Sequence, residues 1–294
     1  IGAFGFLRGA FNSRKVGSSV LDVLQNREIA DAMTLGIVND TADQVDANFL
    51  FPSLTGFGPK APISRRSLRK KISKSYPIFT PRKGSLASLE GGMEDIIRVL
   101  HDTISKMGNV EIILENGEGG PEELSSAYDI PISSMIWTSS LPGRDHGETT
   151  LSVFAVGFQE EEVSGVEIGY GTLIPDPNTP ISGILHESDI HSSRRAPEGH
   201  RLFRLMVPHT RWDGNEQTVR EALRGLNGFS REPAIFRRIG ERAIPRYPPG
   251  YLSSLKNYAG DLSLAGWTGS GVSVTHVVDE AERISELFTR LQKD

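Results

Sequence analysis

The pattern of apolar and polar positions separates stretches with helical spacing from stretches that alternate as strands do. Helical spacing runs over 20–38, after the candidate N-caps Ser18 and Ser19, and over 215–226. The run 88–100 predicts the approach to another helix, with Ile96, Ile97 and Leu100 facing inward. The inward positions expected for the first two helices are Val20, Val23, Leu24, Ala30, Met33 and Ile37, and Val219, Ala222, Leu223 and Leu226.

Strand-like runs concentrate between positions 149 and 209, where turn residues separate them. They cover 151–156, 166–174, 181–185 and 201–207. The connections from the second run to the fourth are too short for crossover helices as a rule, so the sequence predicts an antiparallel sheet. Two further strands are expected at 109–114 and 234–239.

The last part of the chain predicts a strand, a glycine turn and a helix. Residues 261–265 form the expected buried strand, and Gly266, Gly269 and Gly271 let the backbone turn sharply and approach another molecule. The helix that follows has one apolar face, which should pack on a sheet, made by Val274, Val277, Val278, Ala281, Ile284, Phe288 and Leu291. Such a helix N-terminus suits an oxygen-rich anion or a polarised carbonyl. An ordinary strand-to-helix turn explains the same pattern.

Composition narrows the class of protein. With 294 residues the chain can form one large domain or two moderate ones, and its net charge of -5 argues against a nucleic-acid-binding protein. The absence of cysteine excludes thiol nucleophiles, disulfides and Cys-ligated metal clusters. No run of apolar residues is long enough to predict a transmembrane helix.

Charge is strongly segregated along the chain. From 47 to 89 there is no acidic residue, whereas the basic residues are Lys60, Arg65, Arg66, Arg69, Lys70, Lys71, Lys74, Arg82 and Lys83. This block could dock on an anionic membrane surface, where each residue contributes about 1 kcal/mol. It could also bind nucleic acid or an acidic partner, or form a solvated loop.

A family resemblance rests on two motifs near the C-terminus. The run Ile-Pro-Arg-Tyr-Pro-Pro-Gly-Tyr at 244–251, followed by Leu-Ala-Gly-Trp-Thr-Gly-Ser-Gly-Val-Ser-Val at 264–274, resembles the C-terminal signature of protoporphyrinogen oxidase. That family belongs to the FAD-containing, amine-oxidase-like flavoproteins. The resemblance implies that the Ala-Gly turn lies against the flavin diphosphate and the Gly-Val pair beside the flavin ring. The implied FAD-side positions are Gly266, Trp267, Gly271, Val272 and Val274.

The same resemblance implies a substrate side. Residues 169–175 match a family segment that lines the tetrapyrrole pocket, so Tyr170, Gly171, Leu173 and, from the last strand of the region, Met206 become substrate candidates. Taken singly, Leu173 and Met206 are better explained as core residues. Pro208 and His209 depart from two glycines that are frequent in the family, which puts close approach of a flat macrocycle in doubt.

Neither the motifs nor the resemblance points to a catalytic side chain or a metal ligand. Porphyrinogen oxidation needs no protein nucleophile, because the flavin accepts the hydride. His186, Glu187, Asp189 and His191 form a candidate metal cluster, but their spacing does not place them on one face.

The resemblance implies an α/β fold class, as an α+β mixture, in a truncated flavoprotein. It has a helical region, an antiparallel substrate-domain-like sheet and a C-terminal strand-turn-helix. The expected segments are a helical, membrane-domain-like region at 1–84 with a basic loop at 60–83, partial FAD-domain segments at 85–142 and 244–294, and the sheet at 143–243. No Gly-x-Gly-x-x-Gly unit for the FAD diphosphate occurs before residue 91.

Three functions are consistent with this pattern. The first is FAD-dependent oxidation of protoporphyrinogen IX in the heme and chlorophyll pathway, once a missing N-terminal portion or a partner protein completes the fold, with no activity in this chain alone. The second is a non-catalytic accessory subunit derived from that enzyme, in a larger membrane complex of a plastid or mitochondrion. The third is a tetrapyrrole-binding module. The expected location is an organelle, peripheral to the membrane.

Overall fold

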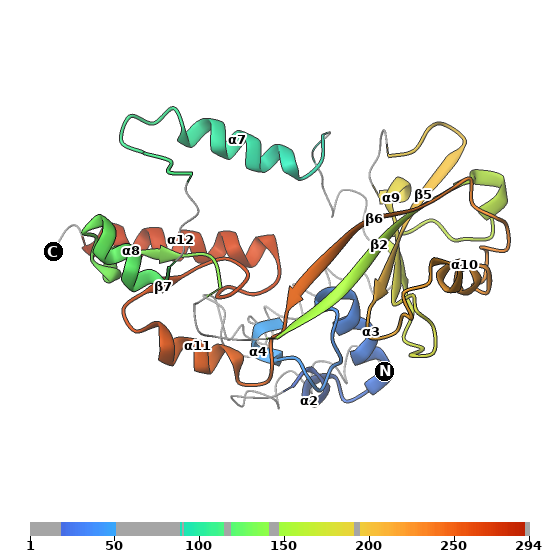
Figure 1. Cartoon of the computed structure of the whole chain (residues 1–294), viewed down its shortest axis with the longest axis horizontal. Coiled ribbons are helices and arrows are strands. Elements are labelled where there is room, and N and C mark those ends of the chain that lie inside the picture. Colours follow the sequence, from blue (N-terminus) through green and yellow to red (C-terminus); the bar gives the residue numbers. More distant parts are fainter. Residues whose placement is uncertain are drawn as a thin grey trace, which may run out of the picture.

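The protein combines helical regions with a five-stranded sheet, and the long strands β2 (Glu148–Gln159) and β6 (Ile235–Pro245) run between them (Figure 1). The computed structural model describes residues 19–50, 89, 91–114, 119–140, 147–190 and 195–291. The basic residues from Lys60 to Lys83 lie outside the described residues. The mixture of helices, an antiparallel sheet and a small parallel sheet confirms the predicted α/β class.

The five-stranded sheet has the order β3-β4-β5-β2-β6, and every neighbouring pair is antiparallel, as predicted. Its other strands are β3 (Gly171–Leu173), β4 (Gly183–His186) and β5 (His200–Pro208). The strand expected at 166–174 is shorter than predicted. The carbonyl of Val166 accepts a hydrogen bond from Arg201 and the N–H of Gly169 donates to Asp189, so side chains satisfy this backbone in place of a ladder.

One face of this sheet forms a core with α10 (Glu216–Arg224). Val219 and Leu223 of α10 pack among aromatic and aliphatic strand residues, as the helical spacing predicted. The strand side of this core includes Phe154, Val156, Phe158, Phe203 and Leu205, all with 0% exposure. Burying each such side chain stabilises the fold by about 2 to 3 kcal/mol.

A second core joins the first helices to the C-terminal segment. It contains α2 (Val20–Leu24), α3 (Arg27–Val38), α4 (Ala47–Leu50) and α11 (Tyr251–Ala259). Phe49 stacks on Tyr247 with ring centroids 4.1 Å apart, and Tyr251 meets both rings edge-on. Residues more than 190 positions apart in the sequence therefore share one core.

The prediction of a single helix over 20–38 is wrong, because the chain breaks between α2 and α3. Gln25 takes the left-handed conformation with φ 56°, and Asn26 caps α3 by accepting a hydrogen bond from the N–H of Ile29. Ser19 caps α2 in a capping box with Asp22, as expected for a helix start. The break changes the buried side of α3, so that Leu35 is buried and Ile37 is exposed.

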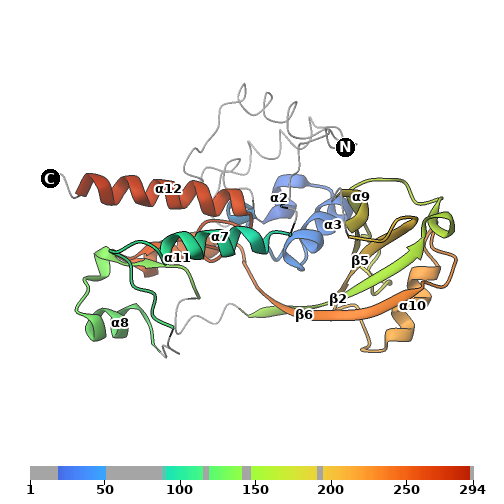
Figure 2. The ribbon, with the colours of Figure 1, turned by 90° about the horizontal axis from the view of Figure 1, so that it is seen from above.

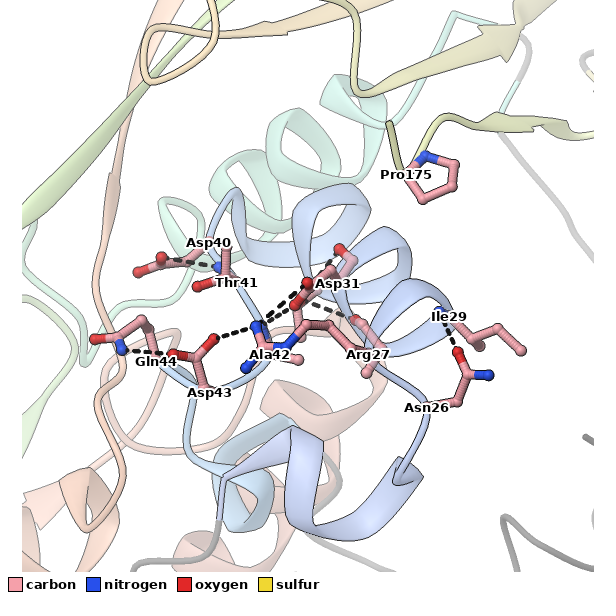
Figure 3. Close-up of polar contacts among 12 residues, drawn as sticks. Asn26, Arg27, Ile29, Asp31, Asp40, Thr41, Ala42, Asp43, Gln44 and Pro175 are labelled. Atoms are coloured by element: carbon pink, nitrogen blue, oxygen red, sulfur yellow. Dashed lines mark hydrogen bonds and ion pairs between the residues drawn. The ribbon is translucent and has the colours of Figure 1, made fainter. Parts of the chain in front are cut away.

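Polar contacts tie the loop after α3 back to the helix (Figure 3). The N–H of Ala42 donates to Asp31 over 2.8 Å, and Arg27 contacts Asp43 over 3.1 Å. The Asp43 pKa is lowered to about 2 by hydrogen bonds, first from Gln44 and then from Arg27. These contacts fix the direction in which the chain enters α4.

Five further elements lie away from α10, with α8 and α12 at the opposite end of the molecule (Figures 1 and 2). They comprise α7 (Glu94–Ile104), α8 (Pro121–Tyr128), β1 (Ile136–Trp137), β7 (Ser263–Leu264) and α12 (Val274–Leu291). Strand β1 pairs with β7 in parallel over two residues each. We call these five elements and the loop 105–114 the β1–β7 region.

Three expectations about this region are wrong. Helix α7 buries none of its residues, and Ile97 is 66% exposed. Residues 109–114 form no strand, and Leu114 is 90% exposed. Ile284 is the one member of the α12 apolar face found in the buried core of the described residues. Parallel strands are normally covered on both faces, and in the described part of the chain no strand extends the β1–β7 pair.

None of the helices within the described residues is long and apolar enough to cross a lipid bilayer.

Candidate functional site

The strand-turn-helix predicted at the C-terminus is present, with β7 leading through a glycine turn into α12. The N–H groups of Gly269 and Ser270 both donate to the carbonyl of Gly266, which closes the turn. Gly266 and Gly271 have φ values of 84° and 99°, which side chains other than glycine rarely adopt. The sequence therefore identified the position and the reason for this turn.

Other parts of this chain occupy the space beside both glycines. A Cβ atom on Gly266 would lie 3.0 Å from the carbonyl oxygen of Thr138, at the end of β1. A Cβ atom on Gly271 would lie 2.8 Å from Nδ1 of His276 and 3.2 Å from the carbonyl oxygen of Phe49. Close packing within the chain is thus sufficient to require glycine at both positions.

Contacts to neighbouring elements hold the turn in place. The hydroxyl of Tyr251 donates to the carbonyl of Thr268 over 2.9 Å, and the Thr268 hydroxyl lies 3.3 Å from the carbonyl of Ser139. Ser273 caps α12 by accepting a hydrogen bond from the N–H of His276. The Ser273 carbonyl also accepts a hydrogen bond from the N–H of Val277, so an anion at this helix start would have to use the N–H groups of Val274 and Thr275.

The five FAD-side candidates divide into outward and inward positions. Trp267 is 57% exposed and Val274 is 59% exposed, so both present apolar surface. Val272 packs against the helical core, and Gly266 and Gly271 approach chain atoms as described above. This arrangement fits one wall of a cofactor site, with an anion-compatible helix end beside exposed apolar side chains. The assignment of these residues to FAD stays a prediction.

The substrate candidates come together on the five-stranded sheet. Leu173 and Met206 are both paired with Gly183, so the three residues form one cross-strand row, and Gly171 lies one row further along the same face. The sequence favoured a core position for each of Leu173 and Met206 when taken singly. Leu173 is half-exposed and Met206 is half-buried, so neither lies in the buried core. A Cβ atom on Gly36 would lie 2.7 Å from Leu173, which places α3 against this end of the face.

Tyr170 lies just before β3 and is half-exposed. Its carbonyl accepts a hydrogen bond from the N–H of His186 over 3.1 Å. The assignment of Tyr170, Gly171, Leu173 and Met206 to a substrate stays a prediction.

His209, which the sequence placed close to Met206, belongs to the opposite face of the sheet. Its Nε2 atom lies 2.8 Å from the hydroxyl of Ser152, and its ring packs against Trp212. Ser152 pairs with the buried Val207, whereas Met206 pairs with Val153. The bulk of the His209 side chain therefore leaves the Met206 face clear.

The candidate metal cluster is instead a buried ion-pair network. Arg201 binds both carboxylate oxygens of Asp189, over 3.1 and 2.6 Å, and donates to two backbone carbonyls. Burial lowers the pKa of His186, with a contribution from Arg201, while Asp189 opposes the shift at 3.3 Å. Across the described residues there is no group of three potential metal ligands, and His191 lies outside them.

Asp46 is a structural residue that the sequence patterns did not identify. One carboxylate oxygen accepts hydrogen bonds from the N–H groups of Asn48 and Phe49, and the other accepts from Gly250 over 2.8 Å. Burial raises the pKa of Asp46, although these backbone N–H groups oppose the shift. Asp46 thereby joins the start of α4 to the start of α11 within the 244–251 motif. An Asp three residues before an aromatic helix position is the signal that could have revealed it.

Comparisons with known proteins give a structural likeness alone. No protein-family model matches the sequence, and no curated protein matches it. Among solved structures, a protein provisionally named a protoporphyrinogen oxidase, from Exiguobacterium sp. 255-15, matches with TM-score 0.53 and 16% identity. The alignment covers 91% of this chain and 65% of that one, so the chain spans about two thirds of the length of that protein.

Two other solved structures are less similar. An oxidoreductase from Methanosarcina mazei matches with TM-score 0.47 and 15% identity, over 97% of this chain and 71% of the other. A reduced UDP-galactopyranose mutase matches with TM-score 0.35 and 15% identity, over 49% and 34%. The first likeness shows the fold, which is a mixed α/β fold shared with that solved structure. At this level of identity the likeness does not extend to a substrate.

Proposed function

We propose that this chain is the later portion of a protoporphyrinogen oxidase-like protein, which oxidises protoporphyrinogen IX with FAD when a dinucleotide-binding segment completes it. The observation that carries the proposal is the agreement between the C-terminal motifs and the fold. The glycine turn that resembles the family's flavin wall occurs in a chain that aligns over 91% of its length with a solved structure of that provisional name.

The residues of the turn would form one wall of the FAD site. Trp267 and Val274 would supply apolar contact, and the first N–H groups of α12 would face negative charge. Bound FAD would accept a hydride from the substrate. This chain's own contribution would be to position the substrate on the face of the five-stranded sheet that carries Leu173 and Met206.

We propose that the chain has no oxidase activity by itself. Binding of FAD in this fold needs a glycine-rich strand-turn-helix for the diphosphate, and the 294 residues contain no Gly-x-Gly-x-x-Gly before residue 91. A plastid or mitochondrial location at a membrane, and contact between the basic residues 60–83 and anionic lipid, belong to the same proposal.

The second candidate function is a non-catalytic accessory subunit. The exposed apolar side chains of the β1–β7 region favour it, because a surface of this kind marks an interaction site. The exposed side chains include Ile97, Leu100, Leu114, Val274 and Val278.

The visible absorption spectrum of the protein purified from its natural source tests these proposals. Bound flavin supports the oxidase, a Soret band without flavin supports a tetrapyrrole-binding module, and neither supports the accessory subunit. Oxygen-dependent formation of protoporphyrin by the isolated 294-residue chain would contradict the proposed need for another segment.

A further inference from the structure

The two faces of the five-stranded sheet differ in how they are covered. Phe154, Phe203 and Leu205 point toward α10 and are fully buried. Cross-strand partners lie on the same face, so Val153, Ala155 and Met206 belong to the opposite face, and all three are only half-buried. We call this opposite side the open face.

A β-bulge in β6 decides which charges lie on the open face. Val153 pairs with Gly240, but Phe154 pairs with Arg238, so Ile239 has no partner on β2. Uninterrupted alternation from Arg237 would bring Glu241 to the open face. The extra residue brings Arg242 there instead, because a bulge exchanges the two faces of the strand beyond it.

Arg237 and Arg242 consequently lie on the same side of the sheet. Arg237 pairs with Ala155 and Arg242 with Leu151, and these two β2 residues are about 13 Å apart along an extended strand. The guanidinium of Arg242 leans over Gly240, with Nη1 3.1 Å from the position of a Cβ atom there. The Arg242 guanidinium therefore lies over Gly240, on the side of Arg242 that faces Arg237 along the strand.

The open face carries excess positive charge. Arg204 is paired with Glu187 over 2.9 Å. Among the described residues, Arg237 and Arg242 have no carboxylate within ion-pair distance. On the α10 side of the same strand, by contrast, Arg238 is paired with Glu241 and lies over the Trp212 ring.

The part of the open face between Arg237 and Arg242 is apolar, and two of its positions are glycines. Ala155, Val153 and Met206 contribute no charged group, and Gly183 and Gly240 contribute no side chain in the Met206 row. A flat apolar body can lie on such a surface, and guanidinium groups bind carboxylates with paired hydrogen bonds.

We propose that the open face binds a flat, largely apolar molecule with two carboxylates, and that Arg237 and Arg242 recognise the carboxylates. The inference rests on the proposed function in that it concerns the same substrate. It adds the residues of the bulged strand β6 as the determinants of specificity.

The test compares binding of protoporphyrin IX with binding of its dimethyl ester, which has the same ring and no charge. The proteins are the unmodified chain, the double variant Arg237→Gln/Arg242→Gln, and the control Arg238→Gln on the other face of the same strand. Thermal unfolding of each protein verifies the fold, because substitutions at exposed positions should leave the unfolding temperature nearly unchanged.

The proposal predicts that the double variant loses about tenfold or more of its affinity for the diacid, since two charge-assisted contacts are removed. Its affinity for the diester should be unchanged, and Arg238→Gln should bind the diacid as the unmodified chain does. Equal losses for diacid and diester, or an equal loss in the Arg238→Gln control, would overturn the assignment of the two arginines.

A third probe separates this inference from the proposed function. Naphthalene-2,6-dicarboxylate is a flat apolar molecule with two carboxylates and is unrelated to tetrapyrroles. If no porphyrin binds but naphthalene-2,6-dicarboxylate binds and depends on Arg237 and Arg242, the dicarboxylate site stands and the tetrapyrrole function fails. If porphyrin binds equally to all three proteins, the tetrapyrrole proposal stands and the arginine assignment fails. Absence of binding of every probe overturns both.

Discussion

The five-stranded sheet and the β1–β7 region differ in how far they bury their apolar side chains. In the sheet, Phe154 and Phe203 are completely covered by neighbouring strands and by α10. In the β1–β7 region, Ile97, Leu100 and Val278 remain at least half-exposed. The sheet therefore buries its large apolar side chains within the described chain, whereas α7 and part of α12 in the β1–β7 region leave theirs exposed there.

The topology of the two sheets explains the difference. The antiparallel sheet is assembled from one continuous stretch between Glu148 and Pro245, which supplies all five strands and also the covering helix α10. The parallel pair joins Ile136 with Ser263, and parallel sheets need cover on both faces from helices and further strands. An apolar pattern in the sequence shows that cover is required and does not show which segment provides it.

The largest expected effect on stability comes from truncating a buried apolar residue of the sheet, and truncation of an exposed apolar residue of α7 is the comparison. Phe203→Ala should lower the free energy of unfolding by about 3 to 5 kcal/mol, because it leaves a cavity among Phe158, Phe229 and His186. The matched change Leu100→Ala on α7 should alter it by less than about 0.5 kcal/mol. Urea unfolding measures both, and a large effect at Leu100 would show that α7 is covered in solution.

Asp46→Ala should destabilise the helical core by about 2 to 3 kcal/mol, because three backbone N–H groups lose their acceptor. Asp43→Ala is the control, since Asp43 lies in the same loop with an exposed ion pair, and it should cost less than about 1 kcal/mol. Equal effects in chemical denaturation would contradict the role of Asp46 in joining α4 to α11.

Gly271→Ala should cost about 1 to 3 kcal/mol through its positive φ and the nearby Phe49 carbonyl, whether or not a cofactor binds. Loss of stability alone therefore does not identify a flavin site. Val274→Ser, at an exposed position beside the turn, should preserve stability and weaken flavin retention. The flavin content of the natural holoprotein, measured by absorbance after denaturation, distinguishes a flavin-binding role of the turn from a purely structural role. Unchanged flavin content in Val274→Ser would argue against the FAD assignment.

The smallest expected effect concerns pH. Burial raises the pKa of Tyr247 to about 12, from an ordinary value of 10.0. The folded state keeps this proton more firmly than the unfolded state, so stability is intact below pH 10 and falls as the pH rises toward 12. The loss should be about 1 kcal/mol at pH 11.

Tyr247→Phe isolates this contribution to the pH dependence. Unfolding curves of the unmodified chain and the variant between pH 8 and 11 should diverge only at the alkaline end. Parallel curves would show that the Tyr247 hydroxyl titrates normally, and hence that the helical core is more open than the structure indicates.

Several features of the fold follow from local sequence. The antiparallel strands, the helix with Val219 and Leu223 inward, and the glycine turn before α12 were all predicted from spacing and turn residues. The break at Gln25 had a signal as well, because Asn26 is a preferred helix N-cap. The strand expected at 109–114 was wrong, since alternation predicts a strand only if another strand is available to pair with it.

The candidate site was less predictable than the fold. The sequence placed Leu173 and Met206 in different strands, and the register then made them neighbours across Gly183. Arg237 and Arg242 were missed, because alternation along β6 assigns them to opposite faces. Gly240 within the strand was the available signal, since an internal glycine often marks a bulge.

The sequence by itself determined most of the antiparallel strands, the helix α10 and the positions that require glycine, because those depend on side-chain periodicity and backbone conformation over a few residues. Only the tertiary structure decided that Phe49 stacks on Tyr247, that Arg242 joins Arg237 on the open face, and that Ile97 of α7 and Val278 of α12 stay exposed in the described part of the chain. Each of these depends on contacts or register between segments distant in sequence. A single unpaired residue, Ile239, is enough to exchange a carboxylate for a guanidinium on one face of the sheet.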